Sequence, residues 1–138
     1  MARFLVDTSA WHRGVATTRL DDRWALMVRR NELALCAPVL LELLYSARDP
    51  RHYAELAYEL SGVPNLPLDP PATRRALETQ ALLAGRSQHR GPTPVDLLIA
   101  AVAELHELVL LHYDRHFEQI ARVTGQPTQW LAKPGSLA

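Results

Sequence analysis

The stretch Leu108-Val109-Leu110-Leu111-His112-Tyr113-Asp114 decides the fold class, because it sets a strong strand between two helical segments. Large aliphatic residues fill positions 108–111, which favours a buried strand. The strongly apolar segment 93–106 before it opens with Thr-Pro-Val-Asp, a sequence typical of a helix start. A second helix is predicted from Asp114 to Val123. A strand held between two helices indicates the α/β class.

The same alternation of strands and helices extends over the rest of the chain. Further strands are expected at 4–6, 33–36, 66–68 and 126–131, and helices at 21–30, 38–47, 51–60 and 70–83. Pro67 restricts its short strand to an edge of the sheet. Strands separated by helices pair in parallel, so we expect a three-layer α/β sandwich with a central, mostly parallel sheet. Without an internal repeat or linker, residues 1–138 are predicted to form a single domain.

Composition narrows the class of protein. The 138 residues are 48% hydrophobic and 22% charged, a balance typical of soluble globular domains. No apolar run approaches the roughly 20 residues that span a bilayer, and the apolar start is too short for a signal peptide, so we expect a cytoplasmic protein. Cys36, the only cysteine, excludes an intrachain disulfide. The net charge of zero neither supports nor excludes a nucleic-acid substrate.

Four carboxylates are the strongest candidates for chemistry. Asp7 directly follows the first strand, Asp114 lies just beyond the strand 108–111, Asp96 falls in the first turn of a helix, and Glu42 stands among five large aliphatic residues. Ligands of open parallel sheets bind beyond the carboxyl ends of the strands, where these acids are expected to converge. Clustered carboxylates repel one another and need a cation. Oxygen ligands favour Mg²⁺ or Mn²⁺ over zinc.

Each of these acids also has a purely structural interpretation. Asp7 and Asp114 suit the N-cap of the helices that follow them. Asp96 stands three residues after Thr93 and completes a capping box. Glu42 can lie at the edge of an apolar helix stripe. The residues therefore permit a metal site without requiring one.

Four segments, taken in order, resemble the PIN-domain ribonucleases, and most closely the VapC-type toxins of bacterial toxin–antitoxin pairs. They are Val6-Asp7-Thr8-Ser9-Ala10-Trp11, Val39-Leu40-Leu41-Glu42-Leu43-Leu44-Tyr45, Thr93-Pro94-Val95-Asp96-Leu97-Leu98-Ile99-Ala100-Ala101 and Leu110-Leu111-His112-Tyr113-Asp114-Arg115-His116-Phe117. The third is the most specific. They are spread along the chain in family-like spacing, and the similarity extends over nearly the whole chain.

The resemblance implies a Mg²⁺- or Mn²⁺-dependent endoribonuclease in a single PIN domain, with tRNA or another structured RNA as the substrate. Its acidic site would consist of Asp7, Glu42, Asp96 and Asp114, with Asp7, Asp96 and Asp114 as metal ligands and Ser9 supporting the site. The resemblance also implies a homodimer and a cognate antitoxin, which alone contacts operator DNA. The alternative function is a non-catalytic PIN-like module that binds RNA or a partner.

The chain departs from the family pattern at His116. Many family members carry a further acid two residues after the fourth one, and histidine stands there in this chain. The change puts a second metal ion in doubt. We expect the His116 side chain to face solvent, with contact to a phosphate as the alternative.

Basic and apolar residues near these motifs suggest further contacts. Arg86, Arg90 and Arg115 are candidates to bind the phosphates of the substrate, with a solvated loop as the alternative for the first two. The helical residues Leu40, Leu44, Leu56 and Leu60 fit either a groove for an antitoxin helix or the core.

Rival functions fit the sequence less well. A zinc pair of His112 and His116 has the right spacing but straddles a strand–helix junction. A receiver-type phosphoacceptor needs paired acids after its first strand, where Thr8 stands. An aspartyl phosphatase needs a second acid at position 9, where Ser9 stands.

Overall fold

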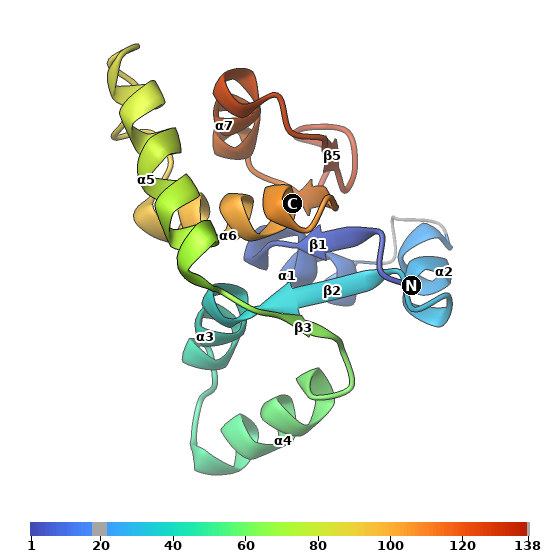
Figure 1. The fold of residues 1–138 in the computed structure, drawn as a ribbon. Helices are drawn as coiled ribbons and strands as arrows, with labels where there is room; N and C mark the ends of the chain where they lie inside the picture. Colours follow the sequence, from blue (N-terminus) through green and yellow to red (C-terminus); the bar gives the residue numbers. More distant parts are fainter. Residues whose placement is uncertain (18–21, 138) are drawn as a thin grey trace.

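The computed structural model describes residues 1–17 and 22–137 and has a parallel sheet at its centre (Figure 1). The strands are β1 (Phe4–Val6), β2 (Leu33–Cys36), β3 (Asn65–Leu66), β4 (Val109–His112) and β5 (Thr128–Trp130). They lie in the order β3-β2-β1-β4-β5, and every neighbouring pair is parallel. The prediction of a mostly parallel sheet is therefore confirmed. The short strand expected at 66–68 lies at an edge as predicted, but it consists of Asn65–Leu66 and ends before Pro67.

Seven helices of the described chain flank the sheet. They are α1 (Thr8–Ala16), α2 (Arg23–Arg29), α3 (Ala37–Tyr45), α4 (Pro50–Leu60), α5 (Pro70–Ala84), α6 (Pro94–Leu105) and α7 (Arg115–Thr124). In Figure 1, α4 extends beyond the β3 end of the sheet, whereas α7 lies near β5 at the opposite end. The predicted helix at 21–30 is confirmed as α2, although Asp21 lies outside the described residues.

The core explains why β1 and β4 lie among the three inner strands of the sheet. Phe4, Leu5 and Val6 of β1 are all buried, as are Leu110 and Leu111 of β4. Strands covered on both faces need such continuous apolar runs. Of the two interpretations left open for Leu40, Leu44, Leu56 and Leu60, the structure favours the core: Leu60 is buried, and the other three pack against the cluster of buried side chains.

Strand order sets the place of the site. From β1 the chain moves to β2 and β3 on one side, then returns across the sheet to β4 and β5 on the other. The order in which strands are added to the sheet therefore reverses between β1 and β4, although the two strands run parallel. In open parallel sheets this reversal leaves a crevice beyond the carboxyl ends of the two strands, where ligands bind.

The contact between α1 and α2 yields a first prediction. Trp11 and Trp24 pack edge to face at 5.4 Å, and a Cβ atom at Gly14 would lie 2.5 Å from the Trp24 ring. Gly14→Ala should therefore lower the free energy of unfolding by about 1–3 kcal/mol despite the better helix propensity of alanine. Gly85→Ala is the matched control, because a Cβ there meets nothing closer than 3.4 Å. Equal stability of both variants in urea unfolding would contradict this account.

Candidate active site

Two of the predicted acids lie side by side at the point where the strand order reverses. Asp7 directly follows β1, Asp114 lies two residues after β4, and Val6 pairs with Leu111 across these strands. The backbone N–H of Asp7 donates to the Leu111 carbonyl at 3.0 Å, which extends the pairing to the edge of the sheet. Both carboxylates therefore lie at the crevice that the topology creates.

Asp7 is held in a nearly closed environment. It is 4% exposed, and its carboxylate accepts hydrogen bonds from the Ala10 N–H at 3.0 Å and the Ser9 N–H at 3.1 Å. Burial raises the pKa of Asp7 to about 7, hydrogen bonds from Ala10 and Ser9 oppose this rise, and the charge of Asp96 adds to it. A carboxylate with a pKa so raised needs either a proton or a cation.

Ser9 links the two turns that carry these acids. Its hydroxyl group lies 2.8 Å from Oδ1 and 2.9 Å from Oδ2 of Asp7, to which it donates. The same oxygen accepts a hydrogen bond from the Tyr113 N–H at 3.0 Å. One hydroxyl group thus ties the turn after β1 to the turn after β4 and sets the distance between Asp7 and Asp114.

Asp96 lies at the electrostatic centre of the four acids. The capping box expected from the sequence is present, since Asp96 accepts from the Thr93 N–H and the Thr93 hydroxyl accepts from the Asp96 N–H. Burial raises the pKa of Asp96, its hydrogen bonds with Thr93 lower it, and the charges of Asp114 and Glu42 raise it further. Because Asp96 also acts on Asp7, it is coupled to all three other acids. The capping role and a place in the site are therefore compatible.

Glu42 approaches the site from α3. Its Oε1 accepts a hydrogen bond of 2.6 Å from the Thr8 hydroxyl, in the turn directly after Asp7. Glu42 is half-buried, and it lines a pocket of about 580 Å³ together with Val95 and Leu98 of α6. Thr8 and Ser9 thus orient two different carboxylates of the site.

A compact set of ligand atoms lies at the start of α7. Single donor atoms of Asp96, Asp114 and His116 all lie within 4.8 Å of one another. His116 Nδ1 is 3.4 Å from Asp114 Oδ1, and the His116 N–H caps the helix by donating to that oxygen at 2.9 Å. The expectation that His116 faces only solvent is wrong, because it turns toward both acids. The sequence signal was the Asp-Arg-His spacing at a helix N-terminus, which bends the third residue back toward the first.

The charges of the acids are left unbalanced by the protein. Within residues 1–17 and 22–137, no arginine or lysine pairs with Asp7, Glu42, Asp96 or Asp114. Burial raises the pKa of two of these carboxyl groups, Asp7 and Asp96, and the charges of neighbouring acids raise it further. The donor set, carboxylate oxygens with one imidazole, suits a divalent cation such as Mg²⁺ or Mn²⁺.

His112 has a supporting position that the sequence analysis missed. It is fully buried, its Nε2 lies 2.6 Å from Glu118 Oε2, and its Nδ1 accepts the Asp114 N–H at 3.1 Å. Burial lowers the pKa of His112, against the opposing charge of Glu118. Because both ring nitrogens are occupied, His112 orients the backbone of Asp114 and forms no metal pair with His116. Its position at the end of an apolar strand was the available signal.

The predicted arginines separate into two groups. Arg115 lines a pocket of about 730 Å³ next to His116. Arg86 and Arg90 are exposed on the loop after α5 and do not line that pocket, although Gly91 does. The loop therefore reaches the pocket through Gly91, whereas the side chains of Arg86 and Arg90 do not line it.

The raised pKa of Asp7 predicts a pH-dependent stability in the absence of metal. Unfolded Asp7 releases its proton near pH 3.8 and the folded protein only near pH 7. The contribution of Asp7 to stability is thus complete below pH 3.8 and is lost as the pH rises to 7. In EDTA, the free energy of unfolding should fall by about 3 kcal/mol between pH 4 and 8 relative to Asp7→Asn. Urea unfolding of both proteins measures this, and a difference independent of pH would refute it.

Comparison with known proteins agrees with this geometry. Residues 4–123 match the family model described as PIN domain. The chain is 39% identical to Ribonuclease VapC18 of Mycobacterium tuberculosis, over 97% of this chain and 98% of that protein. It is 40% identical to Ribonuclease VapC2 of the same species, over 94% and 92%.

The fold is also found in solved structures. The crystal structure of DNA-bound VapBC from Salmonella typhimurium matches with a TM-score of 0.77 at 23% identity, over 96% of this chain and 100% of that one. The family resemblance seen in the sequence is thereby confirmed. The chain belongs to the PIN domain family, and the VapC ribonucleases are its homologues.

Proposed function

We propose that this chain is a metal-dependent endoribonuclease that acts as the toxin of a toxin–antitoxin pair. One observation carries the proposal: acids from four separate parts of the chain converge where the strand order reverses, without a protein cation to balance them. The relatives named ribonucleases match almost the whole chain. We further propose that residues 1–138 form a single PIN domain that works in the cytoplasm. In the described chain, no helix is long and apolar enough to span a membrane.

Metal binding is assigned to residues at the starts of α6 and α7. Asp96, Asp114 and His116 would hold the ion, since their donor atoms already lie within 4.8 Å of one another. Asp7 would join them after losing its proton, which its raised pKa makes part of the binding equilibrium. Such an ion polarises a phosphodiester and lowers the pKa of water bound to it.

The remaining groups of the site orient the reaction. Glu42, fixed by the Thr8 hydroxyl, would either complete the shell of the ion or position the attacking water. Ser9 would keep Asp7 deprotonated and aligned by donating to its carboxylate. The substrate would be tRNA or another structured RNA.

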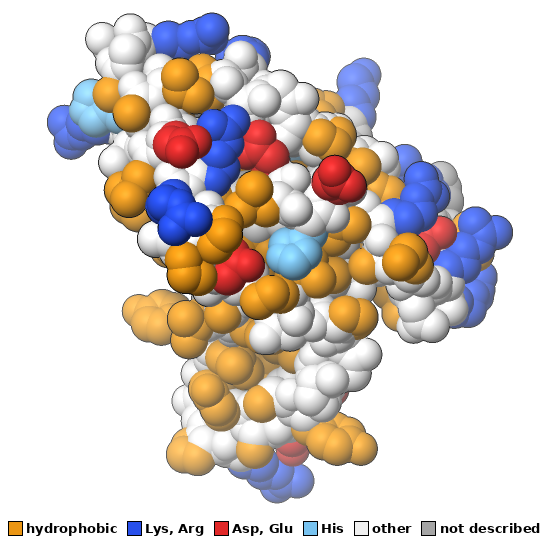
Figure 2. Space-filling view, viewed as in Figure 1, with side chains coloured by type: hydrophobic (Ala, Val, Ile, Leu, Met, Phe, Trp, Pro, Cys, Tyr) orange, Lys and Arg blue, Asp and Glu red, His pale blue; other side chains and the backbone are white. Residues whose placement is uncertain are grey.

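An exposed apolar surface on α3 and α4 lies beside the site. Leu41 and Tyr45 of α3 are 69% and 91% exposed, and Tyr58 of α4 is 83% exposed. Figure 2 shows hydrophobic side chains gathered over these two helices. Exposed apolar surfaces of this kind mark protein interfaces. A cognate antitoxin and a second copy of the chain are the proposed partners, and operator DNA would be contacted only through the antitoxin. The similar structure from Salmonella typhimurium is a VapBC complex bound to DNA.

Removing one carboxylate tests the nuclease. Asp96→Asn should abolish cleavage of RNA in Mg²⁺ or Mn²⁺, because Asp96 is coupled to the three other acids. Asp69→Asn is the matched control, since the Asp69 carboxylate also caps a helix start, by accepting from the Ala72 N–H of α5, but lies outside the acidic set. Metal-dependent cutting of total bacterial RNA is the measurement. A fully active Asp96→Asn protein would refute the site, whereas folded wild type that cuts no RNA would favour a binding-only role.

His116 should set the preference among metal ions. An imidazole ligand favours Mn²⁺ over Mg²⁺ more than a carboxylate does. His116→Asp should therefore reduce the ratio of Mg²⁺ to Mn²⁺ dissociation constants several-fold, as measured by calorimetry or by metal-induced shifts of the melting temperature. His89→Asp introduces the same charge on an exposed loop and should leave the ratio unchanged. An unchanged ratio in His116→Asp would exclude His116 from the metal shell.

A further inference from the structure

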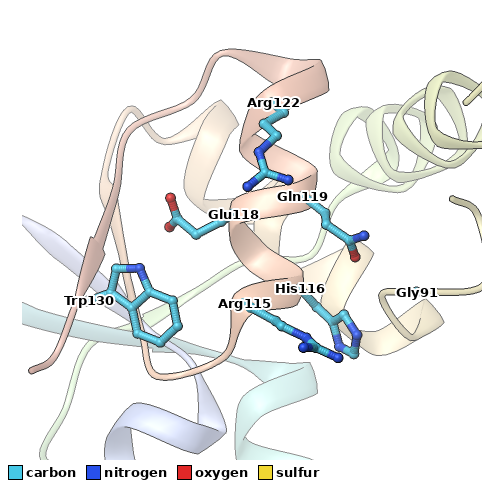
Figure 3. Close-up of a pocket in the computed structure, with 7 residues that line it drawn as sticks. All are labelled: Gly91, Arg115, His116, Glu118, Gln119, Arg122 and Trp130. Atoms are coloured by element: carbon cyan, nitrogen blue, oxygen red, sulfur yellow. The ribbon is translucent and has the colours of Figure 1, made fainter. Parts of the chain in front are cut away.

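A basic pocket adjoins the acidic site along α7. It has a volume of about 730 Å³ and is lined by Arg115, His116, Glu118, Gln119 and Arg122 of α7, with Trp130 from β5 and Gly91 from the loop before α6 (Figure 3). His116 belongs both to this pocket and to the cluster with Asp96 and Asp114. The pocket is therefore continuous with the proposed metal site.

The two arginines occupy one stripe of the helix. Arg115 and Arg122 are seven residues apart, which places them on the same face of α7 and about 10 Å apart along its axis. In Figure 3 they extend from opposite ends of the helix segment that borders the pocket. Groups at this separation can neutralise two different phosphates of one strand.

The positive charge of this stripe is available to a ligand. In the part of the chain that the structure describes, neither Arg115 nor Arg122 forms an ion pair, whereas Arg51 and Arg75 do. Glu118, the acid of the same stripe, already has two hydrogen-bond partners. Its Oε2 accepts a hydrogen bond of 2.7 Å from the Thr128 hydroxyl and lies 2.6 Å from His112 Nε2. The arginines are thus not neutralised by the acid that stands between them in the sequence.

The other walls leave room for a nucleotide. A Cβ atom at Gly91 would lie 2.6 Å from Gln119 Oε1, so a side chain there would push into the pocket. That Gln119 oxygen is buried and has no hydrogen-bond donor among the described residues. Trp130 supplies a half-buried aromatic wall whose ring packs on His112 at 4.8 Å. Aromatic walls next to cationic groups are typical of sites for single-stranded nucleic acid.

We infer that this pocket binds the backbone of the RNA substrate beside the site of cleavage, with Arg115 and Arg122 each neutralising one phosphate. The inference rests on the proposed function and names its substrate-docking site. The acids of the metal site repel phosphate, and the chain as a whole has no net charge. Attraction of the RNA strand must therefore come from a local cationic surface. This pocket is such a surface, and it shares His116 with the acidic cluster.

The salt dependence of RNA binding tests the inference. Fluorescence anisotropy of a labelled single-stranded RNA oligonucleotide, in EDTA to prevent cleavage, gives the binding constant at several KCl concentrations. The logarithm of the binding constant falls linearly with the logarithm of the KCl concentration, and each lost phosphate contact makes this slope less steep by about 0.7. Arg122→Gln should therefore reduce the steepness of the slope by about 0.7. The double variant, Arg122→Gln with Arg115→Gln, should reduce it by about 1.4.

A control with the same change of net charge separates this pocket from a general charge effect. Arg29 and Arg74 are exposed and lie outside the pocket, so Arg29→Gln with Arg74→Gln should leave the slope unchanged. Equal slopes for wild type and the Arg115/Arg122 variant would overturn the inference while leaving the nuclease proposal intact. Folded wild type that neither binds nor cleaves RNA would overturn both.

Discussion

The repulsion between neighbouring carboxylates is the constraint on which the rest of this site depends. Asp7, Asp96 and Asp114 each stand at the N-terminal end of a helix, where backbone N–H groups and the helix dipole favour negative charge. A parallel sheet with crossover helices brings these helix ends to one edge. The fold thus holds the acids together without a protein cation. Burial raises the pKa values of Asp7 and Asp96, and repulsion from neighbouring acids adds to the rise.

Short hydrogen-bonded links keep this arrangement rigid. The Ser9 hydroxyl connects the turns after β1 and β4, and Thr8 holds Glu42 from α3. On the other side, His112 joins the backbone of Asp114 to Glu118, which in turn accepts from Thr128 of β5. The second link also engages the Glu118 carboxylate, which lines the same pocket as Arg115 and Arg122, with His112 and Thr128. One network therefore supports the acidic site and leaves a basic surface beside it.

Much of the fold was accessible from the sequence, because the three inner strands β2, β1 and β4 are largely apolar runs and most helices begin with recognisable caps. The site was harder to separate from ordinary capping. Asp49 and Asp69 cap α4 and α5 through the same hydrogen bond from the third following residue, yet they lie outside the acidic set. The local sequence therefore predicts a helix cap equally well for an acid inside the site and for an acid outside it. Only the family-like motifs around Asp7, Glu42, Asp96 and Asp114 distinguished the candidates.

The sequence by itself determined the class of fold, the edge position of the strand at Leu66 and the four acids, since these follow from local periodicity, proline chemistry and motifs. Tertiary structure decided how the acids are coupled, because Asp96 meets Glu42 and Asp114 only after three crossovers have been packed. It also decided that His116 faces the acids, that His112 supports Asp114, and that Arg122 joins Arg115 at one pocket. These contacts depend on the direction of each side chain in the assembled sheet, which a linear pattern of residues does not contain.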